Sequence, residues 1–534
     1  MTIIELGNIY SKVIKPSARE VAVMDSALSV ETPGASFASS YRSGHWDGMT
    51  RFYKKQGNKF PTGLLSEVVP ALRRIGIEPE IQDKRNIIGY NLDDEVKLAH
   101  AELGEITLRD YQYDSVRLAL ESTRGIINVA TNGGKTEIAC GIIQSIIPQL
   151  KDGQKVAFFT HSKEIFSQSA KRIQERLGMK IGLIGGGKWD EQQVNVVMIP
   201  TISKYIKEPK ELPKIKKLKE LQAEAEGLSG LIRTKGIPEK KLEQHRKEYE
   251  NVKKKLDTYK KGEWDKIKAS VKKTNEFLSS VVAFLGDEVH HASSDTWYQV
   301  FMGLENAYYR FGLTGTVDEK DAINMKRLLG CTGKIVKKVS NEFLIENGYS
   351  AKPTIHLLDI DAEALDNCDY ATARDKGIIN NYKRNRLFVD KVLQRAKFGK
   401  QSLIIVNETE HGNNVLSMFE DTDLNVKFSH GKNTDKHRED VLDELKSGKL
   451  DVLIATPILD EGVDVSGINC LFLMAGGKSM RQLLQRIGRG LRKKSDGSGL
   501  EVYDALDYHN EYLAEHTLER YQTYKAEGFE IYKK

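Results

Sequence analysis

Two short stretches of the chain carry residue types that suit phosphate and metal chemistry. The first is the turn Thr131-Asn132-Gly133-Gly134-Lys135-Thr136. Backbone N–H groups of such a turn can surround phosphates, with the lysine on the β and γ oxygens and the threonine hydroxyl on Mg²⁺. The second is Asp287-Glu288-Val289-His290, after the apolar run 281–285. Its aspartate can hold the metal ion through water, and its glutamate can polarise an attacking water. Together they predict a site that hydrolyses ATP, with Mg²⁺ held by Thr136 and Asp287.

The surroundings of the turn favour this interpretation. The turn follows a predicted strand at 126–129 and opens a predicted helix, which is the context that phosphate binding requires. Val129 stands where the strict phosphate-loop pattern has its first glycine. Simpler interpretations stay open. The turn can be a helix N-terminus with a surface lysine, and the acidic motif can be a charged strand end with solvated or capping histidines.

A glutamine lies about twenty residues upstream of the turn, in Leu108-Arg109-Asp110-Tyr111-Gln112. A glutamine amide can hydrogen-bond both the donor and the acceptor on the edge of an adenine. An ordinary start of an amphipathic helix explains the same residues.

A basic segment near the C-terminus, 482–492, contains Gln485, Arg486, Arg489 and Arg492. Arginines at this spacing suit a γ-phosphate that must be neutralised from outside the first site. The alternative is a basic helix on solvent, but Gly488 and Gly490 would each cost about 1 kcal/mol there. Before this segment, the strand at 452–455 leads into an acidic glycine turn, 455–464, which includes Gly462 and Asp464.

The elements that must position these residues follow a repeating pattern from Leu108 onward. Apolar strands at 126–129, 156–159 and 194–198 alternate with amphipathic helices, and the pattern resumes at 402–406, 452–455 and 470–473. This alternation predicts an α/β fold with two parallel sheets, each covered by helices on both faces. We expect a small N-terminal α+β domain at 1–105 with a helix over 63–75. One sheet domain should span 106–350. The other, 351–534, should end in a helical tail.

An insertion at 207–273 interrupts the first sheet domain. It contains 21 Lys and Arg against 12 Asp and Glu, an excess of nine in a chain whose net charge is +6. Apolar residues at three- and four-residue spacing on both sides of Gly236 and Pro238 predict an antiparallel helical hairpin with a coiled-coil seam. A second helix of about 28 residues would project roughly 40 Å. The hairpin can contact duplex DNA, or its lysines can simply be solvated.

The bulk composition excludes other classes of protein. The 534 residues are 40% apolar and 29% charged, and no apolar run is long enough to span a membrane. The N-terminus has no pattern of a secretory signal. The four cysteines have no paired spacing, so a zinc site or disulfide framework is not expected, and a reducing cytoplasm fits.

The order of the motifs resembles that of the superfamily 2 helicases. It runs from the glutamine turn through the Lys-Thr turn, the Asp-Glu strand end, Leu313-Thr314-Gly315-Thr316 and the acidic glycine turn to the arginine segment, within 108–495. The resemblance implies two RecA-like domains that clamp ATP between them. Within the superfamily, the chain resembles the DNA helicases of T-even phages, and more distantly the XPB-type helicases. The stretches that carry this closer similarity are 41–48, 60–64, 184–187 and 484–489.

The resemblance also implies roles for individual residues. The catalytic set would be Lys135, Asp287, Glu288, Gln485, Arg489 and Arg492. Lys135 would bind phosphates, Asp287 the metal ion, and Glu288 would act as the base. Arg489 and Arg492 would be arginine fingers, and Gln485 would couple the γ-phosphate to domain closure. Thr314 and Thr316 would link the ATP state to the grip on nucleic acid. The nucleotide site would comprise Arg109, Gln112, Thr131, Asn132, Gly133, Gly134, Lys135, Thr136, Gly462 and Asp464.

Loops with hydroxyls, lysines and backbone N–H groups are candidates for gripping a phosphate backbone without reading its sequence. The candidates in the first sheet domain are His161, Ser162, Lys163, Gly187, Lys188 and Thr201. Those in the second, which match the strand-gripping loops of the family, are Asn407, His430 and Thr456. In the N-terminal block, Trp46, Phe52 and Tyr53 lie among cationic residues, which suits either DNA contacts or a small core.

These observations lead to one functional expectation with three rivals. We expect an ATP-dependent DNA helicase or translocase that is a monomer, in the cytoplasm of a host cell if the chain is phage-encoded. Its partners would be branched or duplex DNA, with single-stranded DNA possible, and movement would be 3′ to 5′. An RNA helicase, the motor subunit of a restriction or nuclease system, and a DNA-binding scaffold without turnover stay open.

Overall fold

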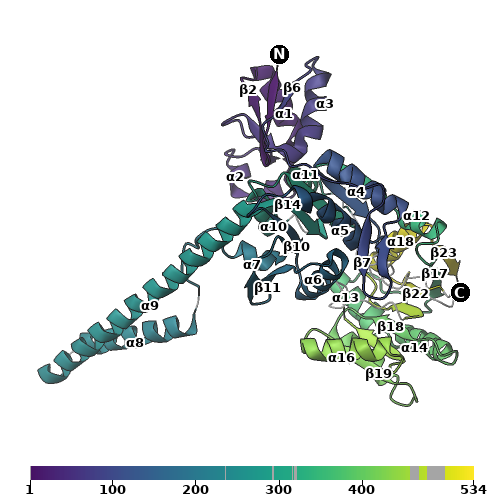
Figure 1. Cartoon of the computed structure of the whole chain (residues 1–534). Coiled ribbons are helices and arrows are strands. Elements are labelled where there is room, and N and C mark those ends of the chain that lie inside the picture. Colours follow the sequence, from purple (N-terminus) through teal and green to yellow (C-terminus); the bar gives the residue numbers. More distant parts are fainter. Residues whose placement is uncertain are drawn as a thin grey trace.

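The computed structural model describes residues 2–213, 215–234, 236–290, 294–315, 317, 321–456, 468–477 and 499–533. These residues form a small N-terminal domain, two lobes that each contain a large parallel sheet, and a helical hairpin that projects from the first lobe (Figure 1). This arrangement confirms the predicted fold class. Across the described ranges, no helix is both long and apolar enough to cross a membrane.

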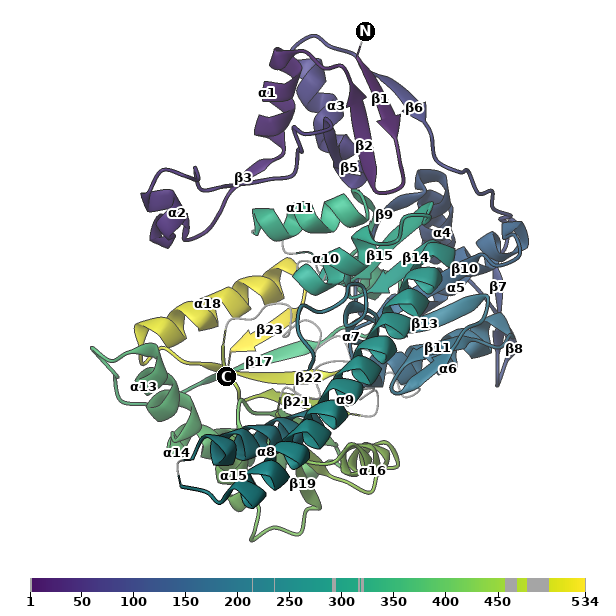
Figure 2. The ribbon, with the colours of Figure 1, turned by 90° about the vertical axis from the view of Figure 1, so that its left-hand side faces the viewer.

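The N-terminal domain is built on a four-stranded sheet of order β5-β2-β1-β6. Its strands are β1 (Ile3–Leu6), β2 (Tyr10–Ile14), β5 (Lys59–Pro61) and β6 (Glu80–Asp83). Helices α1 (Ala18–Ala27) and α3 (Leu65–Arg74) share its core, whereas β3 (Ser29–Glu31), α2 (Ser39–Arg42) and β4 (Met49–Arg51) form an excursion (Figure 2). Phe52 and Tyr53 are buried in this core, so the core explains these two aromatic residues.

The first lobe contains an eight-stranded sheet of order β12-β11-β13-β10-β14-β15-β9-β16, in which only β12 is antiparallel to its neighbour. The strands are β9 (Arg124–Val129), β10 (Lys155–Thr160), β11 (Gly182–Gly185), β12 (Lys188–Asp190), β13 (Val194–Met198), β14 (Val281–Asp287), β15 (Tyr309–Thr314) and β16 (Ile335–Val339). A short hairpin, β7 (Lys97–His100) and β8 (Gly104–Thr107), precedes the lobe.

Helices cover both faces of this sheet, as the alternating sequence pattern predicts. The core on one face includes residues of α4 (Asp110–Ser122), α5 (Lys135–Ile146) and α6 (Lys163–Leu177). The core on the other includes residues of α7 (Ile199–Ser203), α10 (Asp295–Met302) and α11 (Ala322–Cys331). Lys326 of α11 binds the Glu67 carboxylate and donates to the carbonyl of Ala27 at 2.9 Å, which attaches the N-terminal domain to this lobe.

The second lobe contains a fully parallel sheet of order β19-β20-β18-β21-β22-β17-β23. Its strands are β17 (Thr354–Asp359), β18 (Ser402–Ile405), β19 (Val426–Ser429), β20 (Val452–Ala455), β21 (Cys470–Leu473), β22 (Glu501–Leu506) and β23 (Glu530–Lys533). Its helices are α13 (Tyr370–Arg374), α14 (Tyr382–Ala396), α15 (Thr409–Ser417), α16 (Asp435–Lys446) and α18 (Glu511–Ala526), and α12 (Asn341–Glu346) precedes them. The C-terminal tail is therefore helical only as far as Ala526, because β23 adds an edge strand beside β17.

The hairpin consists of α8 (Lys216–Arg233) and α9 (Glu239–Ser280), which pack together with Val252 and Leu256 buried in their seam. The predicted length of the second helix is wrong. It contains 42 residues rather than about 28, a length of roughly 63 Å at 1.5 Å per residue. The helix does not end where the charge excess ends, because Thr274, Phe277 and Leu278 continue it into the lobe, where they are buried. The outer part projects away from both lobes (Figure 1).

Candidate nucleotide and nucleic-acid site

The turn at 131–134 connects the carboxyl end of β9 to the first residue of α5, which is Lys135. Gly134 is left-handed at φ 76°, and Asn132 shares this conformation at φ 70°. A Cβ atom at Gly133 would lie 2.3 Å from Val129 Cγ1, and one at Gly134 would lie 2.1 Å from Gln112 Nε2. Glycine is therefore required at both positions, and the backbone lies close to its surroundings.

The start of α4 holds this turn through one carbonyl oxygen. The Tyr111 hydroxyl donates to the carbonyl of Gly133 at 2.9 Å, and Gln112 Nε2 donates to the same oxygen at 3.2 Å. The other end of the Gln112 amide accepts a hydrogen bond from the backbone N–H of Arg109 at 3.0 Å. Gln112 therefore lies beside the phosphate turn, as its motif implies, with both ends of its amide bonded within the protein. Its recognition of adenine stays a prediction.

Arg109 lies at the N-terminal end of the same helix, where its guanidinium stacks over the ring of Tyr349 at 4.5 Å. Arg109 Nη1 also donates to the Tyr111 hydroxyl at 3.3 Å. A guanidinium held on an aromatic face keeps its remaining N–H groups available to a ligand. The sequence pattern did not indicate Tyr111 or Tyr349, because their roles depend on contacts formed only in the folded chain.

The acidic pair lies at the carboxyl end of β14 and faces the lysine of the turn. Lys135 Nζ is 3.2 Å from Glu288 Oε1, and both side chains are more than four-fifths buried. His290 is also buried, and its Nδ1 lies 3.3 Å from Glu288 Oε2 and 3.2 Å from the Thr314 hydroxyl. The solvated alternative for His290 is therefore wrong. This histidine connects the acidic pair to the end of β15.

The two carboxylates of this pair differ in their electrostatic surroundings. Burial, together with the neighbouring charge of Glu288, raises the pKa of Asp287 to about 6. Burial also opposes ionisation of Glu288, but Lys135 and His290 outweigh it and hold the pKa of Glu288 below its usual value. Two adjacent buried carboxylates with a single ammonium group are a set that a divalent cation would stabilise further.

The end of β15 lies against the phosphate turn. A Cβ atom at Gly315 would be 3.4 Å from Lys135 Nζ and 3.7 Å from the Thr131 hydroxyl. The Asn128 amide faces the carbonyl oxygens of Thr314 and Gly315, to which its nitrogen donates at 3.3 and 3.2 Å. Asn128 was not among the predicted residues, because a polar residue inside an apolar strand gives no motif. Thr316 lies outside the described residues.

These features fit a nucleotide with a divalent cation. The turn leads directly into the N-terminus of α5, where the first N–H groups of a helix have no partner within the helix. Lys135 supplies positive charge, Thr136 in the first turn of α5 supplies a hydroxyl, and Asp287 supplies a carboxylate whose pKa is raised by burial and by the neighbouring charge of Glu288. An anion at a helix N-terminus is further favoured by the unpaired N–H groups there.

The candidate nucleic-acid residues of the first lobe lie along the same edge of the sheet. His161 and Ser162 follow β10, and Ser162 caps α6 by accepting a hydrogen bond from the N–H of Ile165 at 3.2 Å. Lys163 is the first residue of α6, Gly187 and Lys188 form the turn from β11 to β12, and Thr201 lies in α7 after β13. Strands β11, β13 and β10 are neighbours, so these loops form one continuous row.

The candidates of the second lobe also follow neighbouring strands, β18, β20 and β19. Asn407 donates to the carbonyl of Ala475, while the backbone N–H of His430 donates to Asn433 at 2.7 Å. Thr456 follows β20, and its N–H donates to the carbonyl of Ser429 at 3.2 Å. Among the described residues, neither the Ser429 nor the Thr456 hydroxyl has a hydrogen-bond partner. Buried hydroxyls without partners are uncommon and suit a ligand-binding edge.

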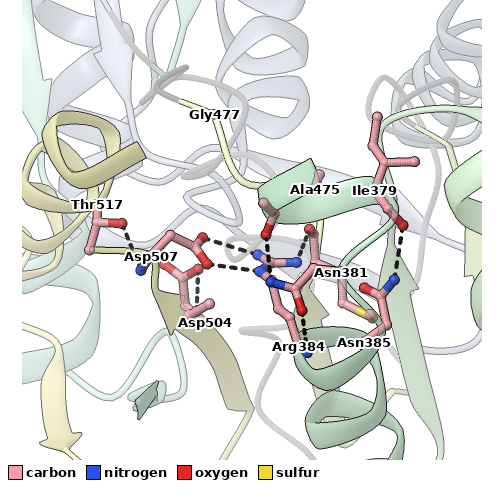
Figure 3. Close-up of polar contacts among 12 residues, drawn as sticks. Ile379, Asn381, Arg384, Asn385, Ala475, Gly477, Asp504, Asp507 and Thr517 are labelled. Atoms are coloured by element: carbon pink, nitrogen blue, oxygen red, sulfur yellow. Dashed lines mark hydrogen bonds and ion pairs between the residues drawn. The ribbon is translucent and has the colours of Figure 1, made fainter. Parts of the chain in front are cut away.

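Five predicted residues lie outside the described ranges: Gly462, Asp464, Gln485, Arg489 and Arg492. The described segment 468–477 precedes the region of three of these residues. A buried ionic network binds the end of this segment (Figure 3). Arg384 donates to both carboxylate oxygens of Asp507 and, at 2.9 Å, to the carbonyl of Met474. Arg520 donates to Asp504 at 2.8 Å and to the carbonyl of Gly477 at 3.0 Å. This network was not predicted, because its members are far apart in sequence.

Two family models match the two lobes in order. Residues 105–319 match the res subunit of type III restriction enzymes, and residues 384–494 match the helicase conserved C-terminal domain. Together with the Lys-Thr turn and the acidic pair at one edge of the sheet, these matches show that the chain belongs to the superfamily 2 helicases. It is an ATP-dependent helicase that acts on nucleic acid.

Individual relatives cover most of the chain. It is 22% identical over 539 residues to the ATP-dependent DNA helicase uvsW of Enterobacteria phage T4, which covers 94% of this chain and 93% of the relative. It is 24% identical over 463 residues to the DNA 3'-5' translocase XPB2 of Sulfurisphaera tokodaii, covering 79% and 86%. A structure described as an HsdR subunit fragment of a type I restriction enzyme from Vibrio vulnificus has a TM-score of 0.51 at 15% identity, covering 80% and 68%. The similarity to the HsdR fragment concerns the fold alone.

Proposed function

We propose that this helicase acts on DNA, moves 3′ to 5′, and works on forks, displacement loops and four-way junctions in recombination, repair and replication. The carrying observation is that the Lys135–Glu288 pair and the row of strand-end loops occupy one edge of the first-lobe sheet. A site whose contacts would change when ATP binds therefore lies next to loops that suit a phosphate backbone. The choice of DNA is supported by the names and the coverage of the uvsW and XPB2 relatives.

The geometry suggests how the residues would share the work. Lys135 would exchange its contact with Glu288 for the β- and γ-phosphates, which would free the Glu288 carboxylate to accept a proton from the attacking water. His290 would keep that carboxylate oriented, because it contacts the second oxygen. Thr136 and Asp287 would hold Mg²⁺, which neutralises phosphate charge when bound.

The remaining assignments extend the same site. Gln112 and Arg109 would bind the base side of the nucleotide, next to the turn residues Thr131, Asn132, Gly133 and Gly134. Gly462 and Asp464 would complete the nucleotide site from the second lobe, where Arg489 and Arg492 would act as arginine fingers and Gln485 would couple the γ-phosphate to closure. The backbone of the tracked strand would be held by His161, Ser162, Lys163, Gly187, Lys188, Thr201, Asn407, His430 and Thr456.

Lys135→Ala tests the enzymatic part of this proposal. Removal of the ammonium group should lower DNA-stimulated ATP hydrolysis by at least about 1,000-fold, because the transition state would no longer be stabilised by a charge-assisted hydrogen bond to phosphate. Binding to DNA without nucleotide should change little. Lys171→Ala, on an exposed position of α6, is the matched control and should retain wild-type turnover. A scaffold without turnover would show no hydrolysis to lose in either protein.

The substrate part needs a second measurement. ATP hydrolysis stimulated by single-stranded DNA, duplex DNA, a four-way junction and single-stranded RNA should be compared at one salt concentration, because phosphate binding depends strongly on salt. We expect the junction to stimulate best and RNA least. Stronger stimulation by RNA would favour an RNA helicase instead.

A restriction motor is the second candidate, because the first-lobe match is to the res subunit of type III restriction enzymes. The coverage favours a helicase, since the matched region spans 93% of the uvsW relative but 68% of the HsdR fragment. We further propose a monomer located in the host-cell cytoplasm if the chain is phage-encoded. Light scattering of the purified protein, with and without DNA, tests the monomer.

A further inference from the structure

The positive charge of the hairpin is concentrated at one level along the rod. The register of the two helices is fixed there by Lys217, whose Nζ lies 5.7 Å from the Tyr259 ring, and by the buried seam residues Leu218 and Leu256. This register places the start of α8 beside the middle of α9. We call the resulting group the lysine collar: Lys216, Lys217, Lys219, Lys253, Lys254, Lys255, Lys260 and Lys261.

The collar is electrostatically unfavourable for the hairpin itself. Only Glu220 and Asp257 lie within the two stretches 216–220 and 253–261, so eight lysines against two carboxylates leave an excess of six positive charges. The first turn of α8 has no acidic residue and its N-cap, Ile215, has no side-chain hydrogen bond, so Lys216 and Lys217 oppose the helix dipole. Like charges at this density lower the stability of both helices.

The rest of the hairpin differs from the collar in its balance of charge, because outside those two stretches α8 and α9 contain nine Lys and Arg against nine Asp and Glu. Elsewhere on α9, Glu243 and Lys247 lie 3.1 Å apart and Glu263 and Lys266 lie 2.7 Å apart, as is usual for a solvated helix. In the part of the chain that the structure describes, the five collar lysines of α9 take part in no ion pair. Solvation alone explains the balanced charges of the rest of the hairpin but gives no reason for a concentrated positive group that weakens the rod.

The position of the collar distinguishes it from the strand-gripping edge. Lys261 and Lys253 precede the end of α9 at Ser280 by 19 and 27 residues, so the collar lies about 30–40 Å along the helix from the start of β14. The rod projects away from both lobes at this level (Figure 1). A strand held at the lobe edge would not by itself extend to the collar, whereas another part of a branched molecule would.

We propose that the lysine collar binds the phosphate backbone of a second duplex arm of a branched DNA while the lobes hold the first. This inference rests on the proposed function. Duplex DNA carries one charge per about 1.7 Å of axis, which supplies the dense anionic partner that a concentrated group of lysines on several sides of the rod requires. Because such contacts ignore sequence, the rod can remain engaged as the junction moves.

The test compares two variants with the same change in charge. The collar variant replaces Lys253, Lys254, Lys255, Lys260 and Lys261 with glutamine, and the control variant replaces Lys240, Lys241, Arg246, Lys247 and Lys268, which are all exposed on the same helix. Glutamine has a similar helix propensity, so both rods should keep their helicity by circular dichroism. Dissociation constants for a four-way junction and for a single strand are measured from about 50 to 200 mM salt.

We expect the collar variant to bind the junction at least about 10-fold more weakly, with a salt slope lower by about 0.9 for each phosphate that the rod no longer neutralises. The control variant should keep a slope within about one of the wild type, and single-strand binding should be alike in all three proteins. Equal slopes in the wild type and the collar variant would overturn the proposal, and so would an equal weakening of junction binding in both variants.

A second measurement uses the DNA rather than the protein. A distance of about 30–40 Å corresponds to roughly 9–12 base pairs at 3.4 Å each. Shortening one junction arm from about 20 to about 6 base pairs should weaken binding of the wild type but not of the collar variant. ATP hydrolysis stimulated by single-stranded DNA, measured in the same proteins, reports on the motor alone. Its loss would contradict the proposed function, whereas an arm length without effect would contradict only the collar.

Discussion

Replacing Gly134 with alanine would test how α4 controls the phosphate turn. The new Cβ atom would lie 2.1 Å from Gln112 Nε2, so the amide must leave its hydrogen bond to the carbonyl of Gly133. Three contributions add up: about 1–2 kcal/mol for a left-handed alanine, about 1 kcal/mol for the broken hydrogen bond, and about 1–3 kcal/mol for overpacking. We expect the free energy of unfolding of the first lobe to fall by about 3–6 kcal/mol in total.

Gly153→Ala is the matched control for this substitution. Gly153 has φ 79°, against 76° for Gly134, but a Cβ atom there would meet no atom within 4 Å. Gly153→Ala should therefore lower the free energy of unfolding only by the backbone contribution, about 1–2 kcal/mol. In a lobe of this size, 1 kcal/mol corresponds to about 2–4 °C in melting temperature. We expect Gly134→Ala to lower the melting temperature by roughly 10 °C or more and Gly153→Ala by roughly 4 °C.

A double-mutant cycle isolates the contact with Gln112. In a Gln112→Ala background the clash disappears, so Gly134→Ala should cost no more than Gly153→Ala does. Calorimetry follows the melting of each protein, and ATP hydrolysis reports whether the turn still works. The reasoning would be refuted if Gly134→Ala were equally destabilising with and without Gln112, because the amide would then not be what the new methyl group displaces.

Three further predictions concern the second lobe and the hairpin. Burial lowers the pKa of His411 to about 3, so the unfolded chain takes up a proton below pH 6.5 that the folded chain refuses. The free energy of unfolding of the second lobe, measured with urea, should therefore fall by about 2 kcal/mol from pH 6.5 to pH 5, and this fall should be absent in His411→Gln. Asp507→Asn leaves the buried Arg384 without its carboxylate, and the same assay should show a loss of about 3–5 kcal/mol. Deletion of 210–270 with a short Gly-Ser linker should preserve DNA-independent ATP hydrolysis but weaken junction binding, and an unchanged affinity and salt slope would contradict any DNA contact by the rod.

Buried parallel strands were the most predictable part of the fold. The runs at 126–129, 156–159 and 402–406 are mostly apolar and do not alternate with polar residues, because both faces of each sheet are covered by helices. The turn around Lys135 and the pair Asp287-Glu288 were predictable for a related reason. Each follows such a strand, so topology alone brings both to one edge of the sheet.

Residues whose role depends on a partner distant in sequence were not predictable. Asn128 carries no pattern by itself, and the contact between His290 and Thr314 does not follow from the place of His290 in the acidic motif. Helix α9 was predicted too short because it passes from solvent into the core without a proline, glycine break or cap near residue 273. Its charge pattern changes there, but its backbone does not.

The continuity of α9 has a mechanical consequence. The helix ends at Ser280, β14 begins at Val281, and the seventh residue of that strand is Asp287. The rod and β14 are thus one uninterrupted backbone with its pivot at the buried Phe277 and Leu278. A tilt of the 42-residue helix by one degree displaces its far end by about 1 Å, given a length of roughly 63 Å. A force on the tip of the hairpin would therefore produce a torque at this pivot, immediately next to the strand that leads to the acidic pair.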